Sequence, residues 1–229
     1  MSLIADEVTA RAWVAERFGA LDRLERLAGL LREENERQNL VARASLDHVW
    51  QRHIVDSAQL LTVSRGTIPA GPWLDLGTGA GFPGLVIAVL EPERPVILVD
   101  SRRLRTEWLQ RAADSLDLPN VRVTLARVED LPDCRAAVIS ARAFAPLPRL
   151  LELSARFSTP QTLWLLPKGA RARQELAELE SGWRHLFHVE QSLTDPEAGV
   201  LVGHLLDTSS RNPASHPNRR KAANKGTQR

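Results

Sequence analysis

The sequence predicts an α/β fold in which helices cover both faces of a mostly parallel β-sheet, with a helical segment at the N-terminus. From residue 73 onward, short apolar runs alternate with segments whose apolar residues recur at helical spacing. A glycine-rich turn follows the first apolar run directly, and the pattern before residue 64 is helical. Strands that alternate with helices are joined by crossover connections, which produce parallel sheets buried on both faces.

The N-terminal segment is expected to hold helices over residues 6–18, 21–37 and about 46–61, with Ser45 as the N-cap of the last. In the second helix, leucines at helical spacing form one apolar stripe: Leu21, Leu24, Leu27, Leu30 and Leu31. Charged residues cover the opposite face, as in a helix that packs on a core. Because the turn-rich residues 64–72 end this segment, we expect a helical cap over residues 1–65.

The following part, residues 66–207, is expected to form the sheet domain. Strands are predicted at 73–76, 96–100, 121–126, 136–140 and 161–166, and helices at 83–91, 102–117, 148–157 and 170–180. Two later extended stretches, 183–191 and 199–206, predict an antiparallel pair that closes the sheet. Together these segments predict a seven-stranded mixed sheet.

The composition is typical of a cytoplasmic enzyme with one sizeable core. Of the 229 residues 43% are hydrophobic, so a single core with a small appendage needs no covalent staples. The lone cysteine, Cys134, excludes an intramolecular disulfide and a multi-cysteine zinc site. No apolar run approaches the roughly 18 residues that span a bilayer, and the N-terminus lacks a signal-peptide pattern. We expect a cytoplasmic monomer without a membrane partner.

The net charge of +2 is divided unevenly along the chain. Residues 208–229 carry six basic side chains and no acidic one, which leaves a net charge of −4 on residues 1–207. A flexible basic tail suits binding to a polyanion, with Arg219, Arg220 and Lys221 as candidate RNA contacts. A tail that only improves solubility is the alternative, and charge alone does not distinguish RNA from DNA.

Residues 73–84 predict the binding site of a nucleoside-containing cofactor. The apolar run ends in a turn with Gly77, Gly79 and Gly81, where glycine lets bare backbone approach a ligand. A dinucleotide fingerprint, G-x-G-x-x-G with Asp100 about 20 residues later, fits residues 79–84. The S-adenosylmethionine interpretation also accounts for Asp75, near the amino acid end of the cofactor, with Asp100 accepting from the ribose hydroxyls. It is therefore favoured over a dinucleotide, and over a turn that serves packing alone.

Residues that follow the later strands are expected at the same edge of the sheet, because ligands bind at the carboxyl ends of parallel strands. Val128 and Glu129 follow the strand at 121–126, where their backbone groups would meet the adenine edge. Arg142 follows the next strand, beside the path of the methyl group. Lys168 is the only lysine before the tail, which indicates a role specific to an ammonium. Each residue has a purely structural alternative: Glu129 as a solvated acid in a turn, Arg142 as a surface salt bridge, and Lys168 as part of a turn that starts a helix.

One motif in the expected cap combines charged and metal-binding residue types. Arg52 and His53 lie four and three residues before Asp56, so the three share one helical face. A metal site of the H-x-x-D type is the weaker alternative, because it has only two ligands in the sequence, and no metal is expected. Pairing on the helix surface is the default interpretation.

Together, these motifs resemble the RsmG family, also called GidB, of bacterial 16S rRNA guanine-N7 methyltransferases. The matching segments occur in that family's order and spacing, at residues 75–84, 99–101, 127–129, 140–145 and 166–169. Asn39-Leu40 and residues 52–57 resemble its N-L and R-H-x-x-D-S motifs, and the resemblance spans about residues 30–206. The chain departs from the family near residues 198–201, where an arginine is missing, and in the tail, which lacks the usual Pro-Arg-Arg-x-G-x-P run.

The resemblance implies a Rossmann-like class I S-adenosylmethionine-dependent methyltransferase fold, and methylation of N7 of a guanosine in the 530 loop of 16S rRNA, at position 527. It implies cofactor contacts from Gly77, Phe82, Val128, Glu129 and Arg142, with Asp75, Gly79 and Asp100 supporting the site. The implied partner is 16S rRNA or a 30S assembly intermediate. The helix with Arg52 and His53 would lie at the RNA or cofactor entrance, where both residues are candidate RNA contacts. A small-molecule methyltransferase and a non-catalytic RNA-binding module are the alternatives.

The implied reaction needs little acid–base machinery. Guanine N7 carries a free lone pair and no proton, so methyl transfer requires no general base. The sequence has no obvious nucleophile or Ser/His/Asp triad, which this reaction permits. Orientation would dominate, since it can supply roughly 7–11 kcal/mol. Because positive charge appears on the purine, Arg142 and Lys168 are assigned to positioning O6, a phosphate or the RNA loop.

Overall fold

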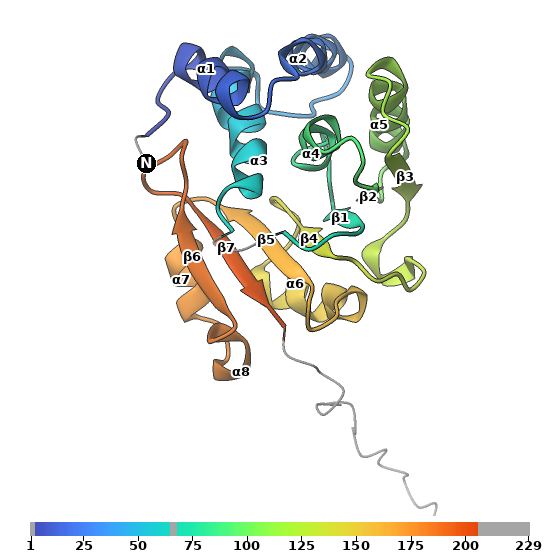
Figure 1. The fold of residues 1–229 in the computed structure, drawn as a ribbon. Helices are drawn as coiled ribbons and strands as arrows, with labels where there is room; N and C mark the ends of the chain where they lie inside the picture. Colours follow the sequence, from blue (N-terminus) through green and yellow to red (C-terminus); the bar gives the residue numbers. More distant parts are fainter. Residues whose placement is uncertain (1–2, 65–67, 206–229) are drawn as a thin grey trace, which may run out of the picture.

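The computed structural model describes residues 3–64 and 68–205. Its strands form one sheet in the order β3-β2-β1-β4-β5-β7-β6 (Figure 1). The strands are β1 Trp73–Leu76, β2 Val96–Asp100, β3 Val121–Leu125, β4 Val138–Ser140, β5 Leu163–Lys168, β6 Phe187–Gln191 and β7 Gly199–His204. Strands β1 to β5 pair in parallel, and β7 runs antiparallel to both β5 and β6. The predicted seven-stranded mixed sheet is therefore confirmed.

The strand order reverses beside β1, the strand that precedes the glycine turn. The chain steps from β1 to β2 and β3 on one side, and then returns to β4 and β5 on the other. Asp75 of β1 lies between Leu98 of β2 and Ser140 of β4, so the carboxyl ends of these strands meet. A crevice forms at such a switch point in open α/β sheets, which is where ligands bind.

Alternating side chains of the strands divide the apolar interior into two clusters. Trp73 and Leu98 belong to one cluster, and Leu74 and Val99 belong to the other. Successive side chains of a strand point to opposite faces, so each face of the sheet has its own core. Both cores are therefore built from the same strands.

Helices cover both cores. The N-terminal helices are α1 Glu7–Arg17, α2 Leu21–Asn35 and α3 Asp56–Ala58. The helices that follow β1 are α4 Gly84–Leu90, α5 Arg103–Ser115, α6 Leu147–Ser154, α7 Ala172–Ala177 and α8 Ser181–Arg184. Figure 1 shows α1 to α5 on one side of the sheet and α6 to α8 on the other. This two-sided cover agrees with the alternation in the sequence.

The segment expected to be one helix over residues 46–61 consists of short pieces. A 3-10 helix, Arg43–His48, leads into a π-helical turn, Trp50–Val55, which continues into α3. The prediction that Ser45 caps this helix is wrong, because Ser45 lies inside the 3-10 helix and donates to the Ala42 carbonyl at 2.7 Å. Glu7 of α1 provides the acceptor instead. Its carboxylate oxygens accept from the amides of Trp50 and Gln51, at 3.0 and 2.8 Å.

The boundaries of β5 and β6 differ from the prediction. Lys168 is the last residue of β5 and does not follow the strand. The first part of the expected strand at 183–191 is α8. The expected tail, with Arg219, Arg220 and Lys221, lies outside the described residues. Within residues 3–64 and 68–205, no helix combines the length and apolar character needed to cross a membrane.

Candidate active site

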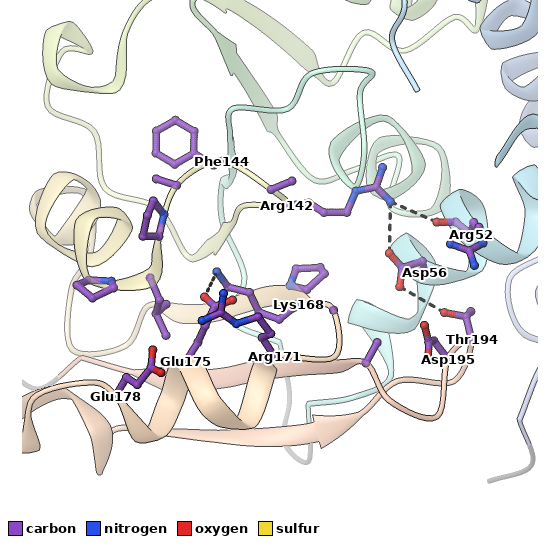
Figure 2. Close-up of a pocket in the computed structure, with 18 residues that line it drawn as sticks. Arg52, Asp56, Arg142, Phe144, Lys168, Arg171, Glu175, Glu178, Thr194 and Asp195 are labelled. Carbon is purple, nitrogen blue, oxygen red and sulfur yellow. Dashed lines mark hydrogen bonds and ion pairs between the residues drawn. The ribbon is translucent and has the colours of Figure 1, made fainter. Parts of the chain in front are cut away.

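Two adjoining cavities lie at the carboxyl ends of the strands. The glycine-turn crevice has a volume of about 460 Å³, and its lining includes Gly77, Asp100, Arg105, Val128, Glu129 and Phe144. The Arg142 cavity has a volume of about 640 Å³, and its lining includes Arg52, Asp56, Arg142, Phe144, Lys168 and Glu175 (Figure 2). The structure thus brings four of the predicted cofactor residues into the lining of one cavity, namely Gly77, Asp100, Val128 and Glu129, whereas Gly79 and Phe82 do not line it. It brings Arg52, Arg142 and Lys168 into the other.

Gly77 forms the floor of the crevice where β1 ends. Its φ of +64° lies in the left-handed region, which favours glycine. A Cβ atom at this position would lie 2.3 Å from Cδ2 of Phe144, so the aromatic ring rests directly on the bare backbone. Both the backbone conformation and this close approach require glycine at the floor of the crevice.

Asp75 holds the glycine turn from below and does not line the crevice. Its side chain is fully buried. One carboxylate oxygen accepts from the Gly84 amide at 3.0 Å, and the other accepts from the Ser140 hydroxyl at 2.7 Å. Burial raises the pKa of Asp75 to about 6, against the effect of the Ser140 hydrogen bond. Asp75 therefore ties the start of α4 to β1 and β4, which makes it a supporting residue of the site.

Asp100 lies at the wall of the crevice with its carboxylate fixed by backbone. One oxygen accepts from the Gly79 amide at 3.0 Å, and the other accepts from the Arg102 amide at 2.9 Å. The Arg105 guanidinium lies 3.6 Å from the same carboxylate. Two carboxylate oxygens offer about four lone-pair positions, so these amides leave capacity for further hydrogen bonds. The residue can therefore bind a diol without giving up its hold on the turn.

Val128 and Glu129 form part of the 3-10 helix Val128–Asp130, directly after β3. Val128 is buried, whereas Glu129 is exposed and lies near Arg127 and Arg149, each at 3.4 Å. One nitrogen of Arg156 donates to the carbonyl oxygen of Val128 at 2.8 Å. This contact fixes the carbonyl side of the 3-10 turn, and a hydrogen bond from the Glu129 backbone lowers the pKa of the Glu129 carboxyl group.

Arg142 connects the loop after β4 to the N-terminal segment. Its Nη1 donates to the Arg52 carbonyl and to Asp56 Oδ2, both at 3.3 Å (Figure 2). Its Nη2 donates to His53 Nδ1 at 3.3 Å. The guanidinium carbon lies 5.3 Å from the centre of the Phe82 ring. Sequence reasoning favoured pairing within the helix for Asp56, whereas the structure pairs it with Arg142. A planar guanidinium held by several acceptors keeps one orientation.

His53 lies beneath Arg142, stacked on Phe82 with ring centres 5.0 Å apart. Because Arg142 donates to Nδ1, the ring hydrogen is on Nε2, which donates to Ser45 Oγ at 3.0 Å. Burial, followed by the charges of Arg142 and Arg52, lowers the pKa of His53 to about 3. His53 is only 7% exposed and Phe82 only 2%, so neither side chain reaches a ligand directly in this arrangement. His53 supports Arg142, and Phe82 can contact a cofactor only through its backbone.

The family of the chain follows from comparison with known proteins. The sequence profile of rRNA small subunit methyltransferase G, GidB, matches residues 20–199. The chain belongs to this family. Ribosomal RNA small subunit methyltransferase G of Novosphingobium aromaticivorans is 64% identical over 230 residues and covers 99% of each chain. The protein of the same name from Erythrobacter litoralis is 59% identical over 204 residues, 88% of this chain and 97% of that relative.

Solved structures share the fold at low sequence identity. The Escherichia coli protein yhhF, named as a candidate methyltransferase, superposes with a TM-score of 0.51 at 13% identity, covering 66% of this chain and 86% of that chain. A candidate S-adenosyl-L-methionine-dependent methyltransferase of Methanococcus maripaludis has a TM-score of 0.50 at 13% identity, covering 67% and 86%. The predicted Rossmann-like methyltransferase fold is confirmed. Family membership identifies the chain as a methyltransferase.

The lining of the Arg142 cavity contains equal numbers of cationic and acidic residues in this member of the methyltransferase G family. Four cationic residues line it, Arg52, Arg142, Lys168 and Arg171, together with four acidic residues, Asp56, Glu175, Glu178 and Asp195. Figure 2 shows Arg142 and Phe144 on one wall and Lys168 with Glu175 on the facing wall. The Lys168 ammonium lies 2.9 Å from Glu175 Oε2, and the two side chains are 11% and 26% exposed. The cavity offers directed donors without a large excess of positive charge.

Several residues of the site were not identified from the sequence. Arg105 falls in the first turn of the helix after Asp100, and that position next to an acid predicted to bind the cofactor was a usable signal. Phe144 belongs to a motif that matched the family, yet its residue type alone suggested no role. No local pattern points to Arg156 or Glu175, because their contacts depend on packing between separate elements. The described residues contain no group of three or more side chains suited to hold a metal ion.

Proposed function

We propose that this enzyme transfers a methyl group from S-adenosylmethionine to N7 of a guanosine in the 530 loop of 16S rRNA, at position 527. The observation that carries the proposal is the junction of two cavities, since the glycine-turn crevice and the Arg142 cavity share the residues Ala143 and Phe144. Membership of an rRNA small subunit methyltransferase family supports rRNA as the acceptor. The substrate would be 16S rRNA or a 30S assembly intermediate, which corresponds to activity in the cytoplasm.

The glycine-turn crevice fits a nucleoside that carries a sulfonium group. Its volume of about 460 Å³ lies within the usual range of small-molecule sites. Asp100 would accept from the ribose hydroxyls, the backbone of Val128 and Glu129 would face the adenine, and the backbone at Gly77 would border the methionine part beside the Phe144 ring. S-adenosylmethionine, when bound, supplies an electrophilic methyl group. Asp75 would hold the turn in the shape that this binding requires.

The residues of the Arg142 cavity would orient the acceptor base. Methyl transfer to N7 demands alignment and no proton transfer, which suits a site without a general base. Arg142 is held by three acceptors, so its guanidinium would present fixed donors to O6 or to a phosphate. Lys168 would do the same from the facing wall. Their partners Asp56 and Glu175 would limit the positive charge that faces a purine as it becomes cationic.

The N-terminal segment and the tail would bind the rest of the RNA. In this proposal residues 1–65 form a cap on a catalytic domain of residues 66–207. Arg52 is exposed at the Arg142 cavity, where it would contact phosphate, and His53 would act by holding Arg142. Arg219, Arg220 and Lys221 in the tail would add phosphate contacts that carry no sequence information. Removing them should weaken RNA binding and reduce its salt dependence.

A calorimetric titration followed by methylation assays tests the proposal. The protein should bind S-adenosylmethionine, transfer a labelled methyl group to unmethylated 16S rRNA or to 30S particles, and modify one guanosine at N7 when the product is mapped. A small-molecule methyltransferase would bind the cofactor and leave both RNA substrates unlabelled. A non-catalytic RNA-binding module would bind RNA with a strong salt dependence and ignore the cofactor. Either result would refute the proposed function.

A further inference from the structure

Phe144 lies where the glycine-turn crevice and the Arg142 cavity meet. Among the described residues, Ala143 and Phe144 are the two that line both cavities. A methyl group that passes from a cofactor in the crevice to a base in the cavity must cross this junction. Phe144 is also the only aromatic residue in the described lining of either cavity. Its ring is therefore the one flat apolar surface at the point of transfer.

The backbone before Phe144 directs the ring to this place. Ala143 has a φ of +53°, a left-handed conformation that is strained for a non-glycine residue. The turn lays the Phe144 ring over Gly77, where an added Cβ would lie 2.3 Å from the ring. Phe144 nevertheless remains partly exposed. A partly exposed aromatic ring, held by a strained turn between two cavities, is placed to contact a ligand.

The other nearby aromatic ring is already covered. Phe82 is 2% exposed, with His53 stacked at 5.0 Å and the Arg142 guanidinium carbon 5.3 Å from the ring centre. It has no free face for a base. Phe144 is the remaining candidate for an aromatic contact in the Arg142 cavity.

An aromatic ring suits an acceptor whose charge changes during the reaction. Bases stack on aromatic side chains regardless of sequence, and the negative face of the ring also attracts cations. When guanine N7 forms its bond to the methyl carbon and the bond from that carbon to sulfur breaks, the positive charge moves from the sulfonium to the purine. A contact that strengthens as this charge develops accelerates the chemical step, because it favours the transition state over the bound substrate.

We propose that Phe144 stacks on the acceptor guanine and stabilises the positive charge that the base acquires. The inference rests on the proposed function and assigns one residue to the acceptor within it. Phe144 then binds the N7-methylated product base more tightly than the unmethylated base, which is a property independent of turnover.

Binding of GMP and of 7-methyl-GMP to the full-length protein tests this assignment. The wild type should bind 7-methyl-GMP at least fivefold more tightly than GMP, in the range expected for a cation over an aromatic face, where tenfold corresponds to about 1.4 kcal/mol. Phe144→Leu should reduce this preference to less than about twofold, and Phe144→Trp should retain it. Replacing Phe144 with 3,4,5-trifluorophenylalanine preserves the shape and weakens the ring face, so it should give an intermediate preference.

Phe18→Leu is the matched control, because Phe18 packs on Trp13 with ring centres 5.6 Å apart and lines neither cavity. It should retain the wild-type preference. Melting temperature and S-adenosylmethionine affinity of each variant report whether the fold and the crevice are intact. Equal affinity of the wild type for both nucleotides, binding of neither, or an unchanged preference in Phe144→Leu would overturn the assignment. Wild-type protein that methylates 16S rRNA in the same series would confine that failure to Phe144 and leave the proposed function standing.

Discussion

The carboxylate of Asp56 and the guanidinium of Arg142 lie 3.3 Å apart, although 86 residues separate them in the chain. Asp56 begins α3 and Arg142 follows β4, so the ion pair joins the N-terminal segment to the carboxyl edge of the sheet. The Arg52 carbonyl and His53 Nδ1 accept from the same guanidinium. The backbone of Arg52 and the side chains of His53 and Asp56 therefore hold the Arg142 guanidinium together.

Replacing Arg142 should impair catalysis far more than stability. Arg142→Ala removes the donors aimed into the cavity and should lower the single-turnover methylation rate about 100-fold or more, which corresponds to about 2.7 kcal/mol. Arg142→Lys should recover only part of this loss, because an ammonium does not reproduce a planar fork of donors. Rapid-quench methylation of 16S rRNA at saturating substrate measures the rate.

Arg111→Ala provides the control for this experiment. Arg111 of α5 also joins an N-terminal helix to the rest of the chain, through Glu34 at 2.9 Å, but it lines neither cavity. Its loss should change stability slightly and leave the methylation rate within about twofold of wild type. An Arg142→Ala enzyme as active as Arg111→Ala would exclude the positioning role of Arg142.

His53 should make the folded state sensitive to mild acid. Its pKa of about 3 in the folded protein lies below the ordinary value of 6.5, so the unfolded chain takes up a proton first as the pH falls. The stabilisation from a neutral His53 is therefore complete above about pH 6.5 and is lost as the pH falls toward 3. Lowering the pH from 7 to 5 should therefore reduce the free energy of unfolding by about 2 kcal/mol through His53. Urea denaturation at both pH values measures the loss.

His53→Asn should remove this part of the pH dependence. His188→Asn serves as the comparison, since the His188 side chain is 55% exposed, pairs with Glu190 and lies outside the site. It should retain the wild-type loss of stability between the two pH values. If wild type, His53→Asn and His188→Asn all lose the same free energy, burial of a neutral His53 does not contribute to acid sensitivity.

The strands and the crevice could be predicted from the sequence because the patterns that indicate them are local. The runs at 73–76 and 96–100 begin and end where β1 and β2 do, since apolar runs bounded by turn residues are read directly. The rule that ligands meet parallel strands at their carboxyl ends then predicted that Gly77, Asp100 and Val128 would share one crevice, as they do. Family motifs added the functional interpretation of that crevice.

The rest depends on packing between distant segments, which no local pattern records. Ser45 has the residue type of a helix cap, but Glu7 of another helix accepts from the amides of Trp50 and Gln51. Asp75 follows the strand signal for a ligand-facing acid, yet hydrogen bonds from Gly84 and Ser140 enclose it. In each case a residue from a distant part of the sequence, Glu7 or Ser140, makes the hydrogen bond that the local pattern did not predict.

Gly77→Ala should weaken cofactor binding while the fold persists. The substitution adds a Cβ 2.3 Å from the Phe144 ring, at a φ of +64° that L side chains rarely adopt. The strain is of order 1 kcal/mol, and relief requires the ring to move into the crevice or the cavity. We expect at least a tenfold loss of S-adenosylmethionine affinity by calorimetry. Gly29→Ala, at a helical position with nothing within 4 Å, should bind normally and gain up to about 1 kcal/mol of stability.

The Lys168–Glu175 pair should act as a unit in which each charge limits the other. Glu175→Gln leaves an uncompensated ammonium in the cavity, which opposes positive charge on the purine, and Lys168→Met removes a donor worth about tenfold in rate. We expect both single variants to methylate 16S rRNA at least fivefold more slowly than wild type. The double variant should be less impaired than the product of the two single effects, because it has neither an unpaired cation nor an unpaired acid. Rates that multiply independently across this cycle would mean that Glu175 does not moderate the charge of Lys168, and that the balance of charges in the Arg142 cavity has no part in catalysis.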